Sequence, residues 1–344
     1  MENEETITSS EQPTTRGYMI VCIKLGLSMC VYFISRYLIS IAAAPLFGIF
    51  GDMSQPVLAA LNLVVLTLFV YVIPLVFTVI IFKYKVPLKI LYKRPKRLAR
   101  AFGTFPATFG FGYGIALLTL LISYILSKML SGETLIEQLL KPTTIEATSS
   151  MSQVIMMVIL MVVAAPLFEE FWVRGVMFDA LKPYGTGIAI IISSILFGLM
   201  HGSLYMLFYT TAYGFALGYI RYATGSLFIV TILHAIVNSV AATTLLLMSL
   251  SEITAKQNRV LNTIYEIYVV AIVILIIISV IVFITKIPAI RRYKFENPWT
   301  QAGPWKKIGL FFISMPVIVM ILLAINEITQ HYIFNLFKNL FIGE

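Results

Sequence analysis

Two adjacent carboxylates, Glu169 and Glu170, lie in an apolar stretch that begins near Ser152. Ionisable side chains at membrane depth are costly, and they therefore mark functional sites by default. On a helix, Glu170 and Arg174 are four residues apart and can form an ion pair, whereas Glu169 lies about 100° away from Glu170 around the axis. The spacing predicts that Arg174 neutralises Glu170. Glu169, left without a cation, then suits a general base.

Two histidines follow on later apolar runs. His201 comes four residues after Phe197, so both rings share one helix face, and His234 comes four residues before Asn238. A carboxylate and an imidazole can deprotonate water, and a second imidazole with a carboxamide can stabilise an oxyanion. These residues therefore predict a site that activates water. The remaining histidine, His331, is expected at the surface.

The composition indicates where these residues must be positioned. The chain is 59% hydrophobic and 12% charged, with a mean hydropathy of +0.92, whereas a soluble domain has about 25% charged residues. We therefore expect an all-α, polytopic integral membrane helical bundle with about eight or nine transmembrane helices. The net charge of +9 does not require a nucleic acid partner, because the basic residues cluster between apolar runs.

Nine apolar runs are expected to form these helices. They cover about 18–42, 57–82, 102–130, 151–174, 186–203, 204–222, 226–248, 263–285 and 308–329. Residues 186–222 are also compatible with one span and a re-entrant piece in place of two short spans. Lys24 and Arg36 in the first run can extend towards the membrane surface or face the bundle interior. Residues 17–344 are expected to form a single transmembrane domain, with a catalytic core at about 151–248.

Charge indicates the orientation of the bundle. Segments 83–100 and 286–307 are rich in Lys and Arg, and the positive-inside rule therefore predicts that both are cytoplasmic. Residues 1–16 are polar and are expected to be a disordered cytoplasmic N-terminus. In this count Glu169 lies at the inner end of its span, but His201 falls towards the outside. The two can meet only if the fifth helix is displaced or tilted, and we then expect a cavity that opens towards the cytoplasmic half.

Three motifs in about 165–240 resemble those of the CPBP family, which comprises CAAX proteases, bacteriocin-processing enzymes and Abi proteins. They are Glu169-Glu170-x-x-x-Arg174, Phe197-x-x-x-His201 and His234-x-x-x-Asn238. The resemblance implies an intramembrane endopeptidase. The implied roles are water activation by Glu169 and His201, an oxyanion hole from His234 and Asn238, and support from Glu170, Arg174 and Phe197.

The resemblance leaves the cofactor open. Family members are usually described as metalloproteases, and Glu169, His201 and His234 are compatible with a zinc site or with catalysis without a metal. The implied partners are the lipid bilayer of a bacterial plasma membrane and a substrate that is a peptide precursor or a membrane-anchored protein. The extension at about 250–344, beyond the compact core of the family, leaves the exact substrate open.

Two alternative functions are compatible with the same residues. A non-catalytic immunity or partner protein can be built on the same scaffold, since an intact motif set does not prove turnover. A proton-coupled transporter, with Glu169, His201 and His234 as a proton relay, is less favoured, because the sequence contains no internal repeat.

Overall fold

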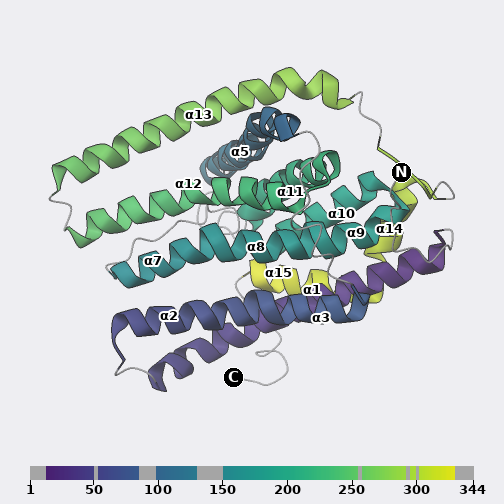
Figure 1. The fold of residues 1–344 in the computed structure, drawn as a ribbon, viewed down its shortest axis with the longest axis horizontal. Helices are drawn as coiled ribbons and strands as arrows, with labels where there is room; N and C mark the ends of the chain where they lie inside the picture. Colours follow the sequence, from purple (N-terminus) through teal and green to yellow (C-terminus); the bar gives the residue numbers. More distant parts are fainter. Residues whose placement is uncertain are drawn as a thin grey trace.

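The computed structural model describes residues 13–49, 53–84, 98–129, 150–254, 258–291, 295–299 and 302–329. These residues form helices and contain no strand, which confirms the predicted all-α class. The helices are α1 (Thr15–Ile49), α2 (Gln55–Leu66), α3 (Ile73–Phe82), α5 (Leu98–Met129), α7 (Met151–Ile159), α8 (Ala165–Glu170), α9 (Phe178–Leu181), α10 (Thr186–Leu199), α11 (Leu204–Thr224), α12 (Leu227–Ile253), α13 (Arg259–Arg291), α14 (Pro304–Phe312) and α15 (Met315–Ile328) (Figure 1).

Short π-helical segments continue some of these helices. One of them, Thr67–Val72, joins α2 to α3. Two others, Leu160–Ala164 and Phe171–Met177, join α7, α8 and α9 into one span. The span from Met151 to Tyr184 runs between a layer that contains α1, α2, α3 and α15 and a layer that contains α12, α11, α5 and α13 (Figure 1). The carboxylate pair therefore lies at the centre of the bundle.

The count of candidate membrane-crossing helices covers the described residues alone, whereas the eight or nine expected are for the whole chain. In the described residues, six spans are long and apolar enough to cross a membrane, or seven if α14 and α15, which are bent by 70°, form one span. The apolar run at 186–203 ends as a helix at Leu199, and α10 with 14 residues is about 21 Å long. A hydrocarbon core is about 30 Å thick, so α10 is too short to cross it.

Contacts at one end of the bundle join four parts of the chain. The Tyr84 hydroxyl after α3 donates to the Asp179 carboxylate at 2.9 Å. The Lys307 ammonium on α14 donates to the Tyr184 carbonyl at 2.7 Å. The Tyr18 hydroxyl near the start of α1 donates to the Lys307 carbonyl at 2.9 Å. We call this end the basic end, because segments 83–100 and 286–307 begin or finish here.

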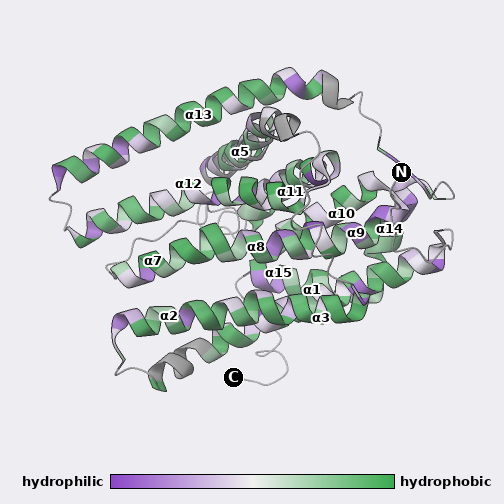
Figure 2. Ribbon diagram, in the orientation of Figure 1, coloured by the Kyte–Doolittle hydropathy of each residue, from purple (hydrophilic) through white to green (hydrophobic). Residues whose placement is uncertain are grey.

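The opposite end, which we call the far end, is where α12 meets α13. There the Ser251 hydroxyl donates to the Asn262 side chain at 2.9 Å. Tyr84 and the end of α13 at Arg291, next to the parts of the two basic segments that lie outside the described residues, thus lie at the same end of the bundle as the start of α1 (Figure 1). That this end is cytoplasmic stays a prediction. Residues 1–12, 85–97 and His331 lie outside the described residues, so the expectations for the N-terminus and for His331 stay predictions. Hydrophobic residues cover most of α12 and α13 (Figure 2).

Candidate active site

The centre of the site is a buried network around Glu170. Its Oε1 atom accepts from Arg174 Nη1 at 3.0 Å, which is the ion pair predicted from the four-residue spacing. The same oxygen lies 2.8 Å from Nδ1 of His234 on α12. An ionised carboxylate can only accept a hydrogen bond, so Nδ1 of His234 carries the proton. Glu170 is therefore held by two cationic or donor partners, one more than the sequence predicted.

Glu169 has a different environment from its neighbour. It is buried, and its Oε1 accepts from the Tyr71 hydroxyl at 3.2 Å. Its Oε2 lies 3.9 Å from Nε2 of His234, which is longer than a hydrogen bond. Among the described residues no lysine or arginine pairs with Glu169, in agreement with the expectation that this carboxylate lacks a cation.

His201 lies on the turn between α10 and α11. Its Nδ1 is 2.8 Å from the Phe197 carbonyl, and because a carbonyl only accepts, Nδ1 carries the proton and Nε2 is free to act as a base. The next residue, Gly202, has a left-handed φ of +64° that favours glycine, and it lets the chain reverse. The turn follows the short helix α10 and therefore lies inside the bundle. His201 can therefore lie near Glu169, although the span count placed it towards the outside. The fifth helix does not have to be displaced.

Phe197 connects the three motifs. Its ring makes edge-on contacts with the His201 ring at 5.0 Å and with the His234 ring at 5.6 Å. The Arg174 guanidinium lies 4.2 Å from the centre of the same ring. A cation over an aromatic face is attracted by the ring quadrupole, so Phe197 orders both imidazoles and the guanidinium.

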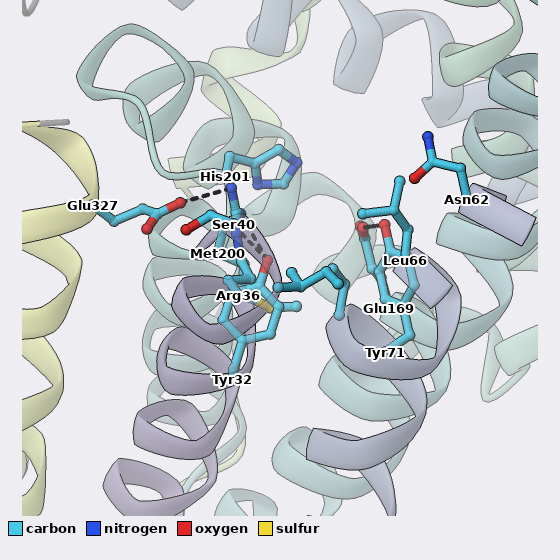
Figure 3. Close-up of a pocket in the computed structure, with 12 residues that line it drawn as sticks. Tyr32, Arg36, Ser40, Asn62, Leu66, Tyr71, Glu169, Met200, His201 and Glu327 are labelled. Carbon is cyan, nitrogen blue, oxygen red and sulfur yellow. Dashed lines mark hydrogen bonds and ion pairs between the residues drawn. The ribbon is translucent and has the colours of Figure 1, made fainter. Parts of the chain in front are cut away.

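A cavity of about 420 Å³ opens beside these residues and is lined by both Glu169 and His201. Figure 3 shows Glu169 and Tyr71 on one side, and His201, Arg36 and Glu327 on the other. The carboxylate and the imidazole thus share one cavity and do not lie at opposite membrane surfaces. The predicted separation of about 6 Å, close enough for one shared water, stays a prediction.

Three residues that sequence reasoning did not place at the site hold the His201 turn. The Tyr32 hydroxyl and Arg36 Nη1 donate to the Met200 carbonyl at 2.6 Å and 2.7 Å. Arg36 Nη2 forms an ion pair with Glu327 Oε1 on α15 at 2.9 Å. For Arg36 and Glu327, the available signal in the sequence was a charged residue inside an apolar run. The Arg36 side chain faces the bundle interior, one of the two positions expected for it.

Asn238 is the motif residue that lies apart from the cavity. It is one turn beyond His234 on α12, and its Nδ2 donates to the Met161 carbonyl at 2.9 Å. The lining of the cavity includes neither Asn238 nor His234. An oxyanion hole from these two residues therefore requires Asn238 to exchange the Met161 carbonyl for the substrate.

The residues do not fit a zinc site as they are arranged. Among the described residues, no three His, Cys, Asp or Glu side chains are grouped so that they could hold a metal ion. The Nδ1 atoms of His201 and His234 are bonded to the Phe197 carbonyl and to Glu170, so only their Nε2 atoms could serve as metal ligands. We therefore derive no chemical step through a metal.

The fold and the network define a polytopic helical membrane protein with a buried glutamate–histidine site. Residues 151–240 match the family model described as Type II CAAX prenyl endopeptidase Rce1-like. This segment contains all three motifs, and the match confirms the resemblance to the CAAX proteases of the CPBP family. No curated protein and no solved structure matches the chain.

Proposed function

We propose that this protein is an intramembrane endopeptidase that hydrolyses a peptide bond with water activated by Glu169 and His201. The observation that supports this most strongly is that these two side chains, from different helices, line one cavity. Burying the Glu169 carboxylate without a lysine or arginine partner is unfavourable, which argues for a functional role of this side chain.

The proposed reaction uses the Glu169 carboxylate and the Nε2 atom of His201. A water molecule between Glu169 and Nε2 of His201 loses a proton to Glu169 as its oxygen attacks the peptide carbonyl carbon. The carbonyl oxygen becomes an oxyanion, which His234 and Asn238 stabilise as donors. The carbon–nitrogen bond then breaks, and Glu169 passes the proton to the leaving nitrogen. The products are a carboxylic acid and an amine.

The Glu170–Arg174 pair orients the imidazole ring of His234. Since Nδ1 of His234 is bonded to Glu170, only the doubly protonated imidazole can also donate from Nε2. Glu170 and Arg174 thus act as positioning residues that keep a donor directed at the reacting carbonyl.

The substrate in this proposal is a peptide precursor or a membrane-associated protein, and the enzyme acts in the plasma membrane of a bacterium. The test compares the peptides and membrane proteins of cells that express the wild type, Glu169→Gln or Glu266→Gln. Glu266 is an exposed carboxylate on α13 and serves as the matched control.

We expect an intact precursor to accumulate with Glu169→Gln and not with Glu266→Gln. Identical profiles for all three proteins would favour the non-catalytic alternative. A proton flux that depends on Glu169, without any change in precursors, would favour the transporter.

A further inference from the structure

The cavity lies in the half of the bundle that is remote from the basic end. At about 1.5 Å per residue, Tyr71 is about 16 Å along the helix from Phe82 at the basic end, and Asn62 is about 30 Å from it. On α1, Ser40 is about 37 Å from Thr15. All three line the cavity or its mouth. If the basic segments are cytoplasmic, as their charge predicts, this placement argues against the expectation that the cavity opens towards the cytoplasmic half.

Packed side chains close the cavity on the side of the basic end. Tyr32 lines the cavity, and its ring lies 5.5 Å from the ring of Trp172. The Trp172 indole is fully buried and donates to the Thr78 hydroxyl of α3, which is closer to the basic end. Met29, one turn before Tyr32, is also fully buried. This layer of buried side chains separates the cavity from the basic end.

The opposite side of the cavity is polar and open. Ser40 and Asn62 are exposed. The exposed fraction of the side chain is 27% for Arg36 and 16% for Glu327. These two charges form an ion pair that is tolerated at an interface with water more readily than in hydrocarbon. These exposed polar groups indicate that water would reach Glu169 and His201 from the far end.

The charge of the connecting segments indicates which membrane face this is. Segments 83–100 and 286–307, which flank the basic end, are rich in Lys and Arg, whereas segment 50–54 has none and segment 254–259 has only Lys256 and Arg259. Short loops with an excess of Lys and Arg remain in the cytoplasm. The far end is then the non-cytoplasmic end.

We propose that the cavity opens to the non-cytoplasmic face and that the substrate is a peptide or membrane-anchored segment presented from that face. The assignment of a substrate rests on the proposed protease function, whereas the direction of access does not. A scissile bond must reach about the middle of the bilayer, because Glu169 lies near the middle of the span Met151–Tyr184.

Cysteine labelling tests the direction of access. Ser40→Cys places a thiol at the mouth of the cavity, and Lys182→Cys places one at an exposed position at the basic end. A charged maleimide that does not cross membranes is added to intact cells or to inverted membrane vesicles. The wild type is the blank, since Cys22 and Cys30 are buried. Unchanged thermal unfolding in detergent establishes that each variant is folded.

We expect Ser40→Cys to be labelled in intact cells and Lys182→Cys to be labelled only in inverted vesicles. The proposal is overturned if Ser40→Cys is labelled only in inverted vesicles, if it is labelled in neither preparation, or if Lys182→Cys reacts in intact cells.

A second measurement separates access from function. A bulky maleimide added outside cells should reduce the rate of precursor cleavage by Ser40→Cys by about tenfold or more, because the attached group fills the entrance of the cavity. The same treatment should not change the rate for Lys182→Cys. If labelling follows the proposal but Glu169→Gln changes no precursor, the cavity opens as proposed and the protease function fails. If cleavage is real but is not blocked from outside, the access route proposed here fails alone.

Discussion

His234 lies between the two adjacent glutamates, with Nδ1 at 2.8 Å from Glu170 Oε1 and Nε2 at 3.9 Å from Glu169 Oε2. One imidazole therefore links a carboxylate that pairs with Arg174 to one that lines the cavity and has no lysine or arginine partner among the described residues. The two glutamates are adjacent in sequence, but they have different physical roles.

The first prediction separates these roles. Glu169→Gln keeps the shape of the side chain and removes the base, so cleavage should fall by about 10²–10⁴-fold with unchanged thermal unfolding. Glu170→Gln leaves Arg174 buried without a counter-charge, and it should also lower the free energy of unfolding by about 3–5 kcal/mol. The measurements are cleavage rate and thermal unfolding in detergent, with Glu266→Gln as control. Equal thermal stability of the two variants would contradict the assignment of Arg174 to Glu170.

The second prediction concerns the turn that carries His201. Gly202 has a φ of +64°, and a Cβ atom there would lie 2.9 Å from Glu327 Cγ. Gly225 has a similar φ of +66° but has open space around it. Alanine at either position should cost about 1–2 kcal/mol of stability, because the left-handed conformation disfavours a Cβ atom.

Only Gly202→Ala should also displace His201 and reduce the rate of cleavage, by up to about 10²-fold. Gly225→Ala is the matched control for backbone strain without crowding. A loss of rate that is the same in both variants would show that strain alone, and not the position of His201, is responsible.

The third prediction concerns Arg36 and Glu327, which lie outside the segment 151–240 that matches the family model. Arg36→Gln should lower kcat by about tenfold or more with little change in KM, because it loosens the Met200 carbonyl beside His201. Glu327→Gln should have a smaller effect in the same direction. Since both variants break the same ion pair, the double variant should lose less than the product of the two single losses.

Arg36→Lys restores the charge but not the paired donors of the guanidinium, and it should recover only part of the rate. A change confined to KM in these variants would indicate that Arg36 contacts the substrate and does not position His201.

Local features of this site could be predicted from the sequence, and long-range ones could not. The Glu170–Arg174 pair depends only on helical spacing, so it was predicted correctly. Tyr71 donates to Glu169, and Arg36 donates to the Met200 carbonyl, from positions far away in the chain. Helical periodicity carries no information about such contacts. Their only signal was the presence of polar groups inside apolar runs.

The depth of His201 was misjudged for a related reason. Hydropathy continues through residues 186–222 without a clear break, so two crossing helices were expected where α10 ends inside the bundle. The glycine after His201 was the available signal, since a glycine with a left-handed φ is a common way to end a helix. The expected opening of the cavity depended on the same count, and the labelling of Ser40→Cys and Lys182→Cys tests it.

The last prediction concerns Asn238, whose carboxamide now bonds to the Met161 carbonyl at 2.9 Å. If Asn238 donates to the oxyanion during the reaction, Asn238→Ala should lower kcat by about 10²–10³-fold. Loss of its hydrogen bond to Met161 should cost only about 0.5–1.5 kcal/mol of stability. A residue that merely joins α12 to the segment Leu160–Ala164 would show the second effect without the first. Thr244→Val, which removes a side-chain hydrogen bond to the Val240 carbonyl further along α12, is the control. Cleavage by Asn238→Ala at the rate of this control would exclude Asn238 from the oxyanion hole and leave His234 as its only donor among the motif residues.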